Sequence, residues 1–140
     1  MLFRSNPSEE VLALVCDAVV VTGTVADVRP YLQHATLVVA PLRVARGIQN
    51  KILEAMAMGR PVVASRSCVE AIAAEDGAEL LSATEAPEFV EHINALLCAP
   101  QRAAAMGRAG RQRVVQHYSW AAHLGGIDRY LPHQQTLSTA

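Results

Sequence analysis

Hydrophobic residues along this chain fall into short unbroken runs that alternate with stretches of helical spacing. The runs at residues 18–22, 36–40 and 61–64 have the length and the β-branched content of buried strands. A weaker fourth strand is expected at residues 79–82. Unbroken apolar runs of this kind are typical of parallel sheets that are covered on both faces. The pattern therefore predicts a buried parallel sheet.

The stretches between these runs carry the start and stop signals of helices. Asp27 is a suitable cap for a short helix that continues through Leu32. A longer helix is expected at residues 50–58, because Gly59 and Pro61 supply a C′ glycine and a proline stop. Further helices are expected at residues 8–15, 68–74, 87–97, 100–117 and 120–131. Strands that alternate with helices predict an α/β fold, namely a Rossmann-like parallel sheet with helices on both faces.

The length of the chain suits one compact domain. Of the 140 residues, we assign residues 1–131 to this domain and residues 132–140 to a flexible polar tail. A doubly wound sheet normally begins with a strand, but residues 1–7 offer few apolar side chains before polar ones. Either a first strand is missing or the domain starts unusually, and we expect that the strand is missing.

Charge and cysteine content exclude several classes of function. The formal net charge is -1, with 12 basic and 13 acidic residues, whereas a nucleic-acid-binding surface needs a basic excess. The three cysteines are widely spaced and match neither a disulfide framework nor a zinc motif. No apolar run is long enough to span a membrane, and the first ten residues do not have the pattern of a signal peptide. We expect a cytoplasmic protein that binds no nucleic acid.

The loop at residues 41–50 is where a ligand is expected to bind. It follows a buried strand and leads into a helix, and ligands of parallel sheets bind beyond the carboxyl ends of the strands. Gly47 allows close approach of the backbone to a ligand, because it has no Cβ. The amides of residues 48–51 are free donors at a helix N-terminus, a place that binds phosphate, and Lys51 adds a positive charge. The alternatives are a turn role for Gly47 and a solvated side chain for Lys51.

Glu54 is the unusual residue of this helix, because the neighbouring side chains are mostly apolar. It lies four positions after Asn50 and therefore shares a face with it. At about 1.5 Å of rise per residue, Glu54 lies roughly 6 Å beyond the Asn50 amide. That offset suits hydrogen bonds from ribose hydroxyls to the carboxylate while a diphosphate binds the amides. The alternatives are a carboxylate that reaches solvent and one that pairs with Lys51.

A family resemblance extends this interpretation. Residues 47–63, which include Glu54-Ala55-Met56, resemble the signature of glycosyltransferase family 4 (group 1). The segment at residues 22–41 and the later Tyr118-Ser119-Trp120 are similar to the parts of the family that flank this signature. The resemblance thus covers nearly the whole chain. It implies the C-terminal half of a GT-B fold, in which two Rossmann-like domains enclose a cleft.

The resemblance also implies roles for individual residues. Glu54 would bind the ribose of a nucleotide sugar. The nucleobase would lie near Gly23, Thr24 and Val25, and the diphosphate would bind Arg46, Gly47, Ile48, Gln49, Asn50 and Lys51. Many members of the family have a first glutamate, eight residues before the second, that contacts the donor sugar, but Arg46 stands there in this chain. Contact with the sugar by that carboxylate is therefore in doubt, and Arg46 is expected to face phosphate instead.

The implied function is transfer of a sugar from a UDP- or GDP-linked donor to an acceptor, without a metal or a separate cofactor. Residues 47–51 are also similar to sugar transferases of PEP-CTERM/exosortase systems, which indicates exopolysaccharide or glycoconjugate synthesis. The family's N-terminal acceptor-binding domain, with its catalytic histidine, has no counterpart in this sequence. No catalytic residue is therefore assigned, and the fragment alone is expected to be inactive.

The expected partners are the nucleotide sugar, the missing acceptor-binding domain and a second copy of this chain. Self-association would use apolar surface left exposed by missing elements. The complete enzyme is expected at the inner face of the membrane. The competing function is a non-catalytic, flavodoxin-like nucleotide-binding or regulatory module. A dehydrogenase would need G-x-G-x-x-G after a strand and a serine hydrolase G-x-S-x-G, and neither motif is present.

Overall fold

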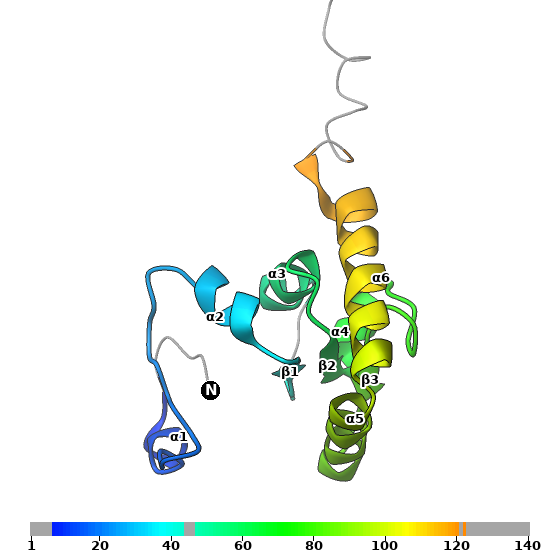
Figure 1. The fold of residues 1–140 in the computed structure, drawn as a ribbon. Coiled ribbons are helices and arrows are strands. Elements are labelled where there is room, and N and C mark those ends of the chain that lie inside the picture. Colours follow the sequence, from blue (N-terminus) through cyan, green and yellow to red (C-terminus); the bar gives the residue numbers. More distant parts are fainter. Residues whose placement is uncertain (1–6, 44–46, 121, 123–140) are drawn as a thin grey trace, which may run out of the picture. The chain divides into compact units, whose positions relative to one another are not determined.

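A computed structural model describes residues 7–43, 47–120 and 122 of the chain. The chain divides into two compact units, at residues 1–34 and 35–140, and each is described here by itself (Figure 1). The second unit contains the sheet and the larger helices.

In the part of the second unit that the structure describes, the sheet has three parallel strands in the order β1-β2-β3. These strands are β1 (Val38–Ala40), β2 (Val62–Ser65) and β3 (Leu81–Ala83). In the register, Val39 pairs with Val63, and Val63 pairs with Leu81. β2 is the central strand and its first three residues are fully buried, as an unbroken apolar run predicts. The expected parallel α/β sheet is thus confirmed.

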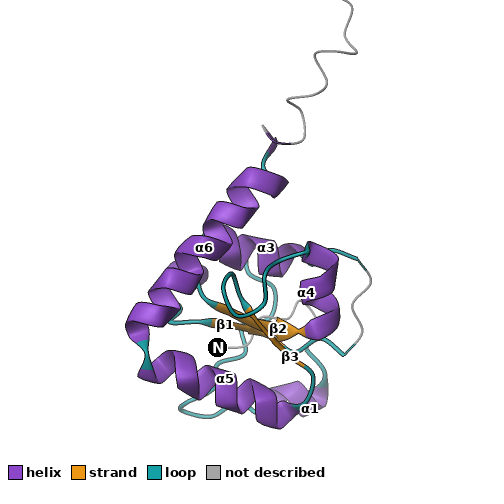
Figure 2. Cartoon of the chain, turned by 90° about the vertical axis from the view of Figure 1, so that its right-hand side faces the viewer, coloured by secondary structure: helices purple, strands orange, loops and turns teal. Residues whose placement is uncertain are grey.

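Among the described residues of the second unit, four helices surround this sheet. They are α3 (Asn50–Ala57), α4 (Arg66–Ile72), α5 (Ala86–Cys98) and α6 (Pro100–Tyr118). α3 and α4 connect successive parallel strands, and right-handed crossovers place both on one face of the sheet. Figure 2 shows α5 on the other side of the sheet. The helices therefore flank both faces, as expected.

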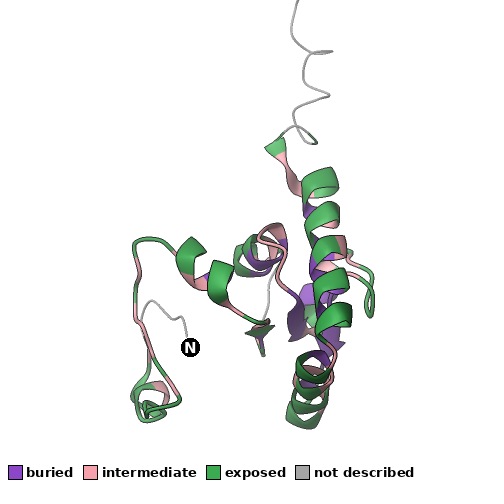
Figure 3. Cartoon of the chain, in the orientation of Figure 1, coloured by how far each residue is buried: buried purple, intermediate pink, exposed green. Residues whose placement is uncertain are grey.

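The buried residues concentrate between the sheet and these helices (Figure 3). On the α5 side, the core cluster includes Val63 of β2, Leu81 of β3, and Phe89 and Leu96 of α5. Met106 of α6 joins the same cluster. Burial of such side chains stabilises the fold by about 1.5–3 kcal/mol each. Because the core fixes the strands, it also fixes the loops that leave their carboxyl ends.

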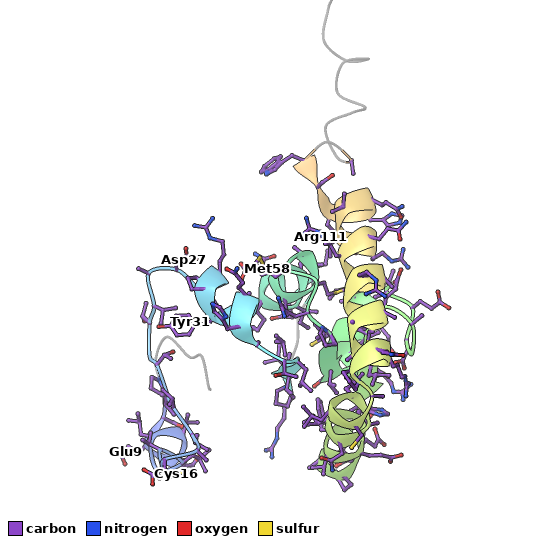
Figure 4. All side chains as sticks on the ribbon, in the orientation of Figure 1. Glu9, Cys16, Asp27, Tyr31, Met58 and Arg111 are labelled. Carbon is purple, nitrogen blue, oxygen red and sulfur yellow. The ribbon has the colours of Figure 1, made fainter. Side chains whose placement is uncertain are left out.

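Close contact between α6 and the end of α3 depends on two glycines. Gly59 follows α3 with φ +67°, a left-handed conformation that stops the helix as the sequence predicts. A Cβ at Gly107 of α6 would lie 2.2 Å from the Gly59 carbonyl oxygen. Nearby, the Arg111 guanidinium donates to the Ala57 carbonyl, and Figure 4 shows Arg111 pointing from α6 toward the end of α3. The side of α6 that faces α3 therefore has no room for a larger residue at position 107.

The described residues of the first unit, 7–34, form two short helices, α1 (Glu9–Leu12) and α2 (Arg29–His34). Asp27 stands at the start of α2 as predicted, since its carboxylate accepts the Arg29 amide at 2.9 Å. The Arg29 guanidinium also binds this carboxylate, and these bonds hold the pKa of Asp27 below its ordinary value. α1 is shorter than the expected helix at residues 8–15, because the chain turns after Leu12.

The strand expected at residues 18–22 is wrong. Cys16 and Val19 exchange backbone hydrogen bonds of 3.1 and 3.0 Å, which close a tight turn at Asp17 and Ala18. Val20 is exposed. An apolar run becomes a strand only where a neighbouring strand forms hydrogen bonds with its backbone N–H and C=O groups. The structure assigns no strand to the described residues of this unit.

The other boundaries differ from the expected ones by small shifts. β1 and β3 begin two residues later than expected, and α4 begins two residues earlier, directly after β2. The helix expected at residues 120–131 and the tail at residues 132–140 lie outside the described residues, apart from positions 120 and 122. The single-domain boundary at residue 131 and the missing first strand stay predictions.

Candidate functional site

The first turn of α3 presents backbone amides that have no acceptor in the described part of the chain. Gly47 has φ +67°, and the chain then extends through Gln49, whose carbonyl accepts the Ile52 amide at 2.9 Å. Gln49 supplies no side-chain cap to α3; its amide group donates to the Gly47 carbonyl at 3.3 Å. Within the described residues, the amides of Asn50 and Lys51 therefore donate to no protein acceptor. This arrangement can bind an anion, as the sequence predicts.

Glu54 lies on the exposed side of α3, one turn after these amides. Ile52, Ala55 and Met56 form the buried side of the helix, whereas Asn50 and Glu54 are exposed. In the described part of the chain, Glu54 forms no ion pair, so the pair with Lys51 that was one alternative is absent. Exposure fits both a ribose contact and a solvated carboxylate, and the ribose role stays a prediction.

Cys68 lies in the first turn of α4, and its side chain is buried. Burial raises the pKa of the Cys68 thiol, while a hydrogen bond with Ser67 and the positive charge of Lys51 act in the opposite direction.

A groove of about 880 Å³ opens beyond the carboxyl ends of all three strands. Its charged lining consists of Arg43, Arg66, Glu70 and Glu85. Its apolar lining includes Val39, Leu42, Phe89 and Val90. Sequence reasoning placed a ligand beyond the strands but did not single out this lining. The signal was present, because polar residues follow each of the second and third strands directly.

Hydrogen bonds link the strand ends that border this groove. The Ser65 hydroxyl donates to the Ala40 carbonyl at 3.4 Å, which joins the ends of β1 and β2. Arg66 Nε donates to Thr84 Oγ1 at 3.5 Å, which joins the ends of β2 and β3. The Thr84 amide in turn donates to Glu88 Oε2 at 2.7 Å. Side chains at or just after the strand ends therefore link the carboxyl ends of the three strands.

The remaining predicted site residues lie elsewhere. Gly23, Thr24 and Val25 belong to the first unit, where Gly23 has φ +65° and its carbonyl accepts the Thr22 hydroxyl at 3.1 Å. Their proximity to a nucleobase stays a prediction. Arg46 lies outside the described residues, so its expected contact with phosphate also stays a prediction.

In the described residues, no group of three or more His, Cys, Asp or Glu side chains could hold a metal ion. None of the helices described is both long and apolar enough to cross a bilayer.

Comparison with known proteins identifies the family. The chain matches the family described as Glycosyl transferases group 1 over residues 4–99, which is more than half of its length. The match includes all three strands and the helices α3 to α5. No curated protein matches the chain. The parallel sheet with flanking helices agrees with the Rossmann-like, C-terminal half of a GT-B fold. The chain therefore belongs to the group 1 glycosyl transferases, which implies a nucleotide-sugar donor.

Proposed function

We propose that this chain binds the nucleotide diphosphate of the donor at the first turn of α3, with Glu54 on the ribose. The diphosphate is assigned to residues 46–51 and the nucleobase, of UDP or GDP, to residues 23–25. The observation that carries this proposal is that the amides of Asn50 and Lys51 have no acceptor among the described residues, and that the exposed Glu54 follows one turn later. Family membership supplies the ligand class.

The chemistry of transfer suits this arrangement. The bond between the anomeric carbon and the diphosphate oxygen breaks, the acceptor oxygen forms the new glycosidic bond, and the acceptor loses a proton. Negative charge develops on the leaving diphosphate. Fixed amide dipoles and the Lys51 ammonium stabilise that charge without reorganisation. Glu54 accepts hydrogen bonds from the ribose and fixes the distance of the nucleoside from the helix start.

The acceptor and its proton-accepting group are assigned to the N-terminal domain of the complete enzyme. We place the reaction in exopolysaccharide or glycoconjugate synthesis, at the inner face of the membrane. The similarity of residues 47–51 to transferases of PEP-CTERM/exosortase systems supports this pathway.

The proposal is tested by calorimetric titration of the chain with UDP, GDP, ADP and FMN. We expect saturable binding of UDP or GDP, weakened about tenfold or more by Glu54→Ala, because hydrogen bonds to a charged group contribute about 1.5–3 kcal/mol. Glu91→Ala is the matched control, since Glu91 is an exposed carboxylate on α5. Binding of FMN, or nucleotide binding that ignores Glu54, would support the flavodoxin-like alternative and overturn the proposal.

A further inference from the structure

The C-terminal end of α3 is completed by a side chain of α6. The last four carbonyl groups of a helix have no amide partner within it. In α3, three of them accept the backbone amides that follow the helix; they belong to Glu54, Ala55 and Met56. The fourth, the Ala57 carbonyl, accepts a hydrogen bond from the Arg111 guanidinium (Figure 4). Arg111 therefore satisfies the carbonyl that the following amides do not reach.

Close packing of α6 on α3 brings Arg111 to this place. A Cβ at Gly110 of α6 would lie 3.4 Å from Cε of Met56, which is fully buried in α3. The stem of Arg111 passes beside Gly59, because a Cβ there would lie 4.0 Å from Arg111 Cδ. Arg111 also lies one turn after Gly107, the glycine that meets the Gly59 carbonyl. The packing of the two helices therefore fixes where the guanidinium lies.

The two ends of α3 differ in how their backbone groups are used. At the N-terminal end, the amides of Asn50 and Lys51 have no acceptor in the described part of the chain. At the C-terminal end, the guanidinium is a cation beside the negative pole of the helix dipole. α3 has eight residues, so about 1.5 Å of rise per residue separates its ends by roughly 12 Å. The cation offsets the negative pole, which would otherwise repel an anion at the N-terminal end.

Arg113 makes a similar contact with a different helix. Its Nη2 donates to the Ala73 carbonyl at the C-terminal end of α4, at 2.6 Å, and its Nε donates to Glu79 Oε2 at 2.8 Å. α4 carries none of the residues assigned to the diphosphate. Arg113 is therefore an internal comparison, in which an arginine of α6 binds the end of a helix outside the proposed diphosphate site.

We propose that Arg111 is a positioning residue for the diphosphate site. It holds the C-terminal end of α3 against α6 and offsets the negative pole of the helix. The amides of Asn50 and Lys51 thereby keep their direction and their positive potential. Arg111 acts through α3 and not by contact with the donor. The inference rests on the proposed function, which supplies the anion.

Calorimetric titration of the full 140-residue chain with pyrophosphate at low ionic strength tests this role. Arg111→Ala is expected to raise the dissociation constant by about threefold to tenfold, the size of a helix-dipole effect. Arg111→Lys keeps the charge and should recover most of the affinity. Arg113→Ala is the matched control: it breaks an ion pair and a bond to a helix end, so it lowers stability in urea but leaves the dissociation constant unchanged. Arg108→Ala removes one charge from the exposed face of α6 and controls for net charge.

Two further measurements distinguish positioning from a general loss of stability. In NMR spectra of the ligand-free protein, Arg111→Ala should shift the amide resonances of Asn50 and Lys51, whereas Arg113→Ala should not. In the titrations, the difference between the unaltered chain and Arg111→Ala should narrow as salt is added, because the Debye length is only about 10 Å at 0.1 M. Affinity lost through unfolding would not return in this way. The spectra also report the folding of every variant.

Two results would overturn the inference. They are pyrophosphate binding by Arg111→Ala as tight as that of the unaltered chain, and an equal loss of binding in Arg113→Ala. Failure of the unaltered chain to bind pyrophosphate would instead overturn the proposed function. The resonances of Asn50 and Lys51 then decide the role of Arg111 without a ligand: a shift in Arg111→Ala supports its control of the first turn of α3, and unchanged resonances refute it.

Discussion

Cys68 shows how the position of one residue sets its reactivity. Its side chain is fully buried, and burial raises the pKa of its thiol, whereas Cys16 and Cys98 are exposed. Because the thiolate is the reactive form, a buried thiol with a raised pKa reacts slowly. We predict that Ellman's reagent modifies two thiols rapidly in the native protein and all three after unfolding. Cys98→Ala should lower the rapid count to one. Rapid modification of three thiols in the native state would contradict the placement of Cys68.

The residues of the site differ in how far the sequence could predict them. Gly59 was predictable as a helix stop, because its place between a periodic helix and a proline is a local signal. The exposure of Glu54 was one of the alternatives that the sequence offered, because a glutamate side chain is normally exposed. The Arg66 and Thr84 contact was not, since it joins residues 18 positions apart across two neighbouring strand ends. Only the strand order brings such residues together.

At the scale of elements, the packing of α6 on the end of α3 leaves no space for one added methyl group at Gly107. Glycine to alanine in a helix normally stabilises it by about 0.5–1 kcal/mol. At Gly107 the new Cβ would lie 2.2 Å from the backbone oxygen of Gly59, which cannot move without displacing the end of α3. We predict that Gly107→Ala lowers the free energy of unfolding by about 1–3 kcal/mol, as overpacking does.

Urea denaturation followed by circular dichroism measures this effect. Gln112→Ala, on the exposed face of α6, is the control and should change the free energy of unfolding by less than about 0.5 kcal/mol. A stabilised Gly107→Ala variant would mean that α6 does not pack on the end of α3.

The sequence predicts some helices and strands better than others. α5 and α6 each carry a proline in their first turn and a long periodic pattern, so their bounds agree closely with the sequence. The apolar run at residues 18–22 has equally good strand composition but does not form a strand. A helix satisfies its backbone within one segment, whereas a strand needs a partner that a local pattern cannot guarantee.

At the scale of the whole molecule, the core belongs to one unit. Among the buried hydrophobic residues in the described part of the chain, Leu32 alone precedes residue 35. The three strands, the groove and the first turn of α3 all lie in residues 35–140. The proposed diphosphate site therefore depends on the second unit, while the residues proposed for the nucleobase belong to the first.

This division leads to a prediction for the isolated segment at residues 35–140. Because it contains nearly all of the buried core, it should unfold cooperatively with a free energy of unfolding close to that of the full chain, as urea denaturation measures.

The isolated segment at residues 35–140 should bind pyrophosphate as the full chain does, since α3 is unchanged. It should lose any preference between UDP and GDP, because residues 23–25 are removed. The control is the full chain with Gln33→Ala, because Gln33 is an exposed residue of the first unit that lies outside the proposed nucleobase site. Retained discrimination between the two nucleotides would place base recognition in the second unit and refute the assignment of residues 23–25.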